Sequence, residues 1–88
     1  MPVQDISPQA ARHVLFEFGY GGGDRPGGFT TALIRAASLA DSLNLDRLEH
    51  AFPSLIGAYR VAAKELDGVE RLHAIAGIIP DKQKDGAA

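Results

Sequence analysis

The sequence lacks cysteine and tryptophan altogether, and only 7% of its 88 residues are aromatic. Without cysteine, neither a disulfide framework nor a thiolate metal site is possible. No apolar run approaches the roughly 20 residues that span a bilayer. The first residues, MPVQDISPQ, have neither the basic nor the apolar region of a secretory signal. We therefore expect a cytoplasmic protein with no membrane partner.

Positive charge is not in excess either. Nine Lys and Arg residues stand against eleven Asp and Glu residues, which gives a net charge of −2. A protein that binds nucleic acid usually carries a clear basic patch, and the basic residues here are spread along the chain. A helix-turn-helix that binds DNA is therefore disfavoured, and we expect no nucleic-acid partner.

The usual signatures of catalysis and metal binding are missing as well. The chain has no Cys nucleophile and no Gly-x-Ser-x-Gly element. Each histidine has a carboxylate three or four residues away, which is typical of pairing on a helix surface; the pairs are His13 with Glu17, His50 with Asp46, and His73 with Glu70. The last pair has the Glu-x-x-His spacing of bundle metal sites, but those sites need a second copy of the motif. We expect no enzyme, no metal site and no cofactor.

The sequence does have the composition of one globular domain. Hydrophobic residues make up 45% of the chain and charged residues 23%. A chain of this length forms a single domain with a modest core. We expect residues 1–88 to form that domain, with a loose N-terminus over 1–7 and a frayed polar tail over 81–88.

Capping residues and apolar spacing predict five short helices in an all-α, compact bundle. The first follows the Ser7-Pro8 start, although residues 13–18 also have the composition of a strand. The third is expected to be capped by Asn44, and the fifth by a capping box of Asp67 and Glu70. The expected ranges are 8–18, a second helix from Gly28 or Thr30 to about 40, then 44–52, 53–65 and 67–79, with Pro80 as the final stop.

Each of the five predicted helices has an apolar face. On the second helix the face comprises Phe29, Leu33, Ala36, Ala37 and Ala40, with Ile34 at its edge. On the fourth it comprises Leu55, Ile56, Tyr59, Ala62 and Leu66. We expect both faces to be turned toward other helices.

A glycine-rich loop joins the first two helices. Six of the ten residues from Gly19 to Gly28 are glycine. A structural loop with positive-φ glycines is favoured, followed by a partner-binding loop and then by an anion site at the next helix N-terminus. The Walker pattern fails because Gly28-Phe29 stands where Lys-Ser/Thr is required, and the dinucleotide pattern lacks its preceding strand. The donors of an anion site would be Arg25, Gly27, Gly28, Thr30 and Thr31.

Five short amphipathic helices leave more apolar surface than so small a core buries. Aromatic and Arg side chains dominate protein contacts when a face is left for a partner. The candidate interaction residues are Tyr20, Arg25, Phe29, Phe52 and Tyr59.

Residues 13–37, HVLFEFGYGGGDRPGGFTTALIRAA, resemble a family of small proteins found in actinobacterial phages and actinomycete genomes. The Phe52-Pro53 break and the segment DGVERL at 67–72 extend the resemblance. The family has no assigned activity, so the resemblance implies a phage origin and the cytoplasm of an actinobacterial host. Where the family has His-Pro between the glycine clusters this chain has Gly23-Asp24-Arg25-Pro26, so no role of that His is transferred.

These observations favour a small non-enzymatic protein that binds a host or phage protein, with self-association to a homo-oligomer as one form of that binding. The alternative is a module that binds an anion or phosphate at the glycine-rich loop and the helix that follows it.

Overall fold

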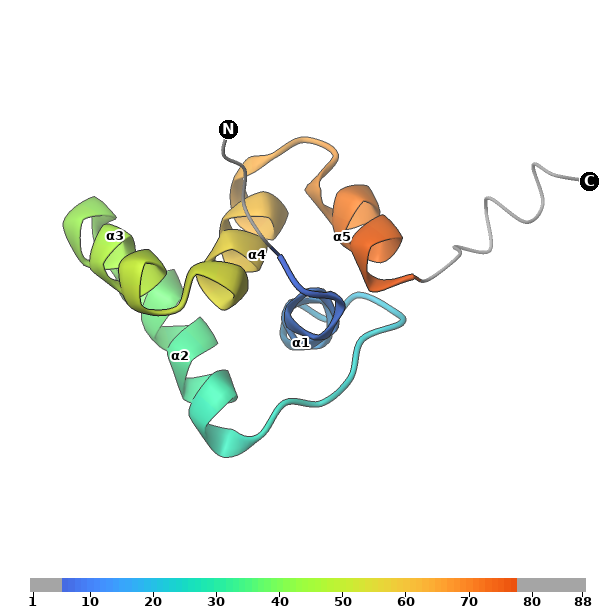
Figure 1. Ribbon diagram of the computed structural model, residues 1–88, viewed down its shortest axis with the longest axis horizontal. Coiled ribbons are helices and arrows are strands. Elements are labelled where there is room, and N and C mark those ends of the chain that lie inside the picture. The colour runs from blue at the N-terminus through green and yellow to red at the C-terminus, as the bar shows by residue number, and fades with distance from the viewer. Residues whose placement is uncertain (1–5, 78–88) are drawn as a thin grey trace, which may run out of the picture.

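The computed structural model describes residues 6–77, and the tail expected over 81–88 lies outside that range. Within it the chain folds into five helices and contains no strand (Figure 1). This confirms the predicted all-α bundle. The helices are α1 Pro8–Glu17, α2 Gly28–Leu39, α3 Ser42–Ala51, α4 Pro53–Lys64 and α5 Gly68–Ala76.

Helix α1 lies at the centre of the bundle, between α2, α4 and α5 (Figure 1). It begins as predicted: the Ser7 hydroxyl accepts a hydrogen bond from the Ala10 N–H at 3.1 Å, and Pro8 follows. It is helical through residues 13–17, which excludes the strand, and it ends before Gly19, whose φ is 83°. Ile6 packs against the core, and the Ser7 N–H donates to the Ser54 hydroxyl at 2.8 Å. The predicted loose N-terminus therefore does not include these two residues.

The core consists of two clusters that share Tyr59. The larger cluster joins α1, α4 and α5, and its fully buried side chains include Val14, Leu15, Val61 and Leu72. Each of these contributes about 1.5–3 kcal/mol by its burial. The smaller cluster joins α2, α3 and α4 through Ala37, Leu45 and Ile56.

Helix α2 buries a different face from the predicted one. Its buried residues are Ile34 and Ala37, whereas Phe29 and Ala36 are exposed. The predicted apolar face was rotated about the helix axis from the face that is buried. Helix α2 is rich in alanine, so several of its faces are about equally apolar. Only its contacts with α1, α3 and α4 select the buried arc.

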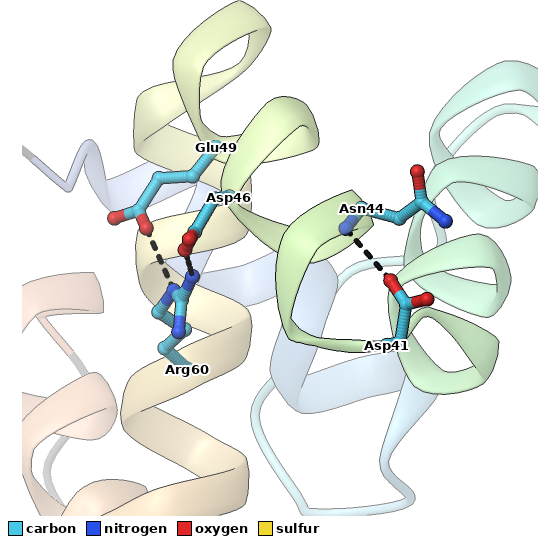
Figure 2. Close-up of polar contacts among 5 residues, drawn as sticks. All are labelled: Asp41, Asn44, Asp46, Glu49 and Arg60. Atoms are coloured by element: carbon cyan, nitrogen blue, oxygen red, sulfur yellow. Dashed lines mark hydrogen bonds and ion pairs between the residues drawn. The ribbon is translucent and has the colours of Figure 1, made fainter.

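The starts and ends of α3 and α5 also differ from the prediction. Asp41, not Asn44, caps α3: the Asp41 carboxylate accepts the Asn44 N–H at 2.8 Å (Figure 2). Asp67 precedes α5 but its side chain makes no capping bond. Gly77, at φ 78°, ends α5 before Pro80, so the predicted stop lies outside the described residues. Within residues 6–77, no helix combines the length and apolar character needed to cross a membrane.

Leu66 is the largest departure on the α4 side. The fourth helix was expected to bury it, but α4 ends at Lys64 and Leu66 lies in the turn that follows, with an exposed fraction of 108%. A helical face cannot continue beyond the last helical residue, so the periodicity no longer decides where this side chain points.

Candidate functional site

The glycine-rich loop is anchored to the bundle. A Cβ at Gly23 would lie 2.6 Å from the Arg12 carbonyl oxygen, so only glycine permits this approach to α1. The Asp24 N–H donates to the same carbonyl at 3.2 Å. A ring nitrogen of His73, on α5, lies 2.8 Å from the Gly21 carbonyl oxygen. These contacts favour the structural interpretation of the loop.

Two of the proposed anion donors already have partners within the chain. The Arg25 guanidinium lies 5.4 Å from the ring centroid of Phe16, where it makes a cation–π contact. The Thr31 hydroxyl donates to the Glu17 carboxylate at 3.4 Å, and this carboxylate opposes an anion at the start of α2. Gly27 precedes α2 without a side-chain cap, Gly28 opens the helix and Thr30 lines a neighbouring groove. Anion binding stays a prediction.

The five candidate interaction residues fall into three groups. The rings of Phe29 and Phe52 meet edge to face at 5.8 Å. Tyr20 and Tyr59 both contact Phe18, at 6.4 and 5.7 Å between ring centroids. Arg25 belongs to the separate contact with Phe16 already described. Their exposure differs as well: Phe29 is 68% exposed and Tyr20 44%, whereas Phe52 and Tyr59 are half-buried.

Phe29 and Phe52 form part of a first groove, of about 330 Å³, where the N-terminal ends of α1, α2 and α4 meet. Leu33 and Leu55 add apolar surface to it, and His13 and Thr30 add polar groups. Of the aromatic residues predicted as anchors, the structure thus brings two together in a concave surface.

A second groove lies between α2 and α3 and has a volume of about 460 Å³. The apolar spacing of the sequence did not predict this groove. Leu39, which lines the groove, is 86% exposed, and Leu43, on the next helix, is 57% exposed. Both leucines lie off the predicted stripes, at the Asp41-Ser42 break, so periodicity gave no signal for them. The groove is lined by Ala36, Leu39, Ala40, Asn44, Arg47 and Leu48.

The charges around this second groove are unevenly paired. Arg60 of α4 binds two carboxylates of α3, Asp46 and Glu49, each at 2.6 Å (Figure 2). Arg47 donates to the Asn44 side-chain oxygen at 3.3 Å, and no described carboxylate lies within ion-pair distance of it. The groove therefore combines an apolar lining with a positive charge that no described residue neutralises.

The predicted histidine pairs are partly replaced by contacts between helices. Asp46 binds Arg60 rather than His50, and Glu17 accepts from Thr31. Over residues 6–77, no three or more His, Cys, Asp or Glu side chains cluster in a way that could hold a metal ion.

Comparisons with protein-family models, curated proteins and solved structures give no match to this chain. The resemblance to the actinobacteriophage family stays a prediction.

Proposed function

We propose that this chain is a non-enzymatic interaction protein that binds another protein through α2 and the start of α3. We refer to this region as the α2–α3 surface, and it comprises Phe29, Leu33, Ala36, Leu39, Ala40 and Leu43.

One observation carries the proposal. Helix α2 is the most apolar of the five helices, yet Ile34 and Ala37 are its only buried residues. Apolar side chains that stay together at the surface gain free energy when a partner removes them from water. The exposed Phe29 supplies an aromatic anchor of the kind that dominates protein contacts.

The family resemblance supplies the expected setting. A phage-encoded protein acts in the cytoplasm of its host, so the expected partner is a host protein or a second phage protein. Self-association through the same surface belongs to the same proposal.

Affinity capture from an actinobacterial lysate tests this function, with the wild-type chain and Leu39→Glu as baits. Ser38→Glu is the matched control, because Ser38 is exposed on the same helix. Adjacent residues of a helix point about 100° apart, so the Ser38 side chain points in a different direction from that of Leu39. We expect a protein retained by the wild type and by Ser38→Glu and lost with Leu39→Glu. Equal retention by all three baits, together with a strictly monomeric wild type in solution, would overturn the proposal.

A further inference from the structure

We infer that the groove between α2 and α3 receives the α4–α5 turn of a second copy of this chain, with Leu66 in the groove and Asp67 against Arg47. The inference rests on the proposed function, since it names the occupant of part of the α2–α3 surface.

The inserted element is the turn after α4. Leu66 is completely exposed there, between two acidic residues. Glu65 is bound by Arg71, which neutralises it. Asp67 stands at the N-cap of α5, yet its carboxylate makes neither the capping bond that this position favours nor an ion pair with a described residue. The turn therefore displays a leucine next to a free negative charge.

The receiving element has the complementary character. Its lining is Ala36, Leu39, Ala40 and Leu48, and the small alanine side chains leave room for a leucine. Arg47 borders the same groove, and the neighbouring α3 carboxylates are both held by Arg60. The groove thus offers an apolar volume next to a free positive charge, which is what Leu66 and Asp67 require.

A single chain does not satisfy this complementarity by itself. Leu66 is exposed rather than seated in its own groove. In Figure 1 the α4–α5 turn lies at the top of the molecule, beyond α4, whereas α2 and α3 lie on the left. The contact therefore joins two copies through different patches, and such head-to-tail contacts form closed rings or open chains. One leucine in one groove makes a small interface, for which we expect a dissociation constant on the order of 0.1–1 mM.

Sedimentation velocity from about 10 µM to about 1 mM tests the contact, because this range brackets the expected dissociation constant. The mean mass of the wild type should rise across the series. Leu66→Asp removes the inserted side chain, and Ala36→Glu fills the groove and repels Asp67; each should remain monomeric. Ser38→Glu, the control on α2, should behave as the wild type. All three positions are exposed, and circular dichroism checks that each variant keeps its helices.

Mixing the two monomeric variants gives the decisive result. Leu66→Asp keeps an intact groove and Ala36→Glu keeps an intact turn, so the mixture should form a one-to-one dimer and nothing larger. The charge reversals Arg47→Glu and Asp67→Lys supply an independent test: each alone should weaken association, and the double variant should restore it.

Three results would overturn the inference. The first is a wild type whose mass does not rise with concentration. The second is self-association that survives Leu66→Asp, and the third is a mixture of the two variants that stays monomeric. A different result would contradict the proposed function: Leu39→Glu would retain as much partner protein as the wild type, and the wild type would be strictly monomeric in solution.

Discussion

Gly68 lies directly against the backbone of Val61, so closely that a Cβ on the glycine would be 2.7 Å from the Val61 carbonyl carbon and closer still to its oxygen. This contact sets the distance between the start of α5 and the last turns of α4. Val61 is itself fully buried in the larger cluster of the core. The close approach of the two backbones therefore brings α5 onto the core.

We expect Gly68→Ala to destabilise the fold by about 1–3 kcal/mol, because the added methyl group overlaps backbone that cannot move aside. Gly28→Ala is the matched control: Gly28 is also the first residue of its helix, and a Cβ there meets nothing within 4 Å. That change should be neutral or stabilise by about 0.4–1 kcal/mol. Urea unfolding followed by circular dichroism measures both, and equal stabilities would contradict the role of the contact.

The glycine-rich loop should detach from α1 in Gly23→Ala. A Cβ at Gly23 would lie 2.8 Å from the Phe16 Cα, so the loop or the helix must shift. Hydrogen exchange at the Asp24 amide, which donates to the Arg12 carbonyl, should become faster. Gly21→Ala adds a Cβ that meets nothing within 4 Å and should leave that exchange rate unchanged. Unchanged exchange in both variants would show that the loop is not held at Gly23.

Arg60 should contribute to stability in a way that depends on salt. Its guanidinium binds Asp46 and Glu49, and its side chain is only 26% exposed. We expect Arg60→Met to lose about 0.5–1.5 kcal/mol at low ionic strength, and less at high salt, because screening weakens the ion pairs. Arg47→Met is the control, since Arg47 has no described carboxylate partner. If the two variants lost the same unfolding free energy, or if the loss in Arg60→Met did not depend on salt, the ion pairs would be ruled out as the source of the stability.

Phosphate and nucleotides should leave the melting temperature unchanged. Arg25 lies over Phe16, and Glu17 places a carboxylate beside Thr31, so the start of α2 offers an anion little charge. A ligand at 100 times its dissociation constant would add about 2.7 kcal/mol to the unfolding free energy. Thermal shift with about 10 mM phosphate or ADP measures this and would detect a dissociation constant near 0.1 mM. A rise that Arg25→Ala abolishes would favour the anion-binding alternative.

Local features of this chain were readable from the sequence because their causes are local. Ser7 and Pro8 start α1, Gly19 ends it at positive φ, and Pro53 separates α3 from α4. In each case the side chain or backbone preference of one residue acts on its immediate neighbours. The all-α class followed from apolar residues at helical spacing in five successive segments.

In α2, and in the turn after α4, the tertiary structure decided which apolar residues are buried. In α2 the alanine-rich sequence offers several similar faces, and packing against α1, α3 and α4 buried Ile34 and Ala37 and left Phe29 and Leu39 outside. Because α4 ends at Lys64, Leu66 is exposed to solvent, and the Asp67 side chain makes no capping hydrogen bond to α5. The burial of a side chain depends on how the other helices are placed around it. The periodicity of a single helix carries no information about that placement. The two elements of the inferred contact between copies therefore come from the packing of the bundle.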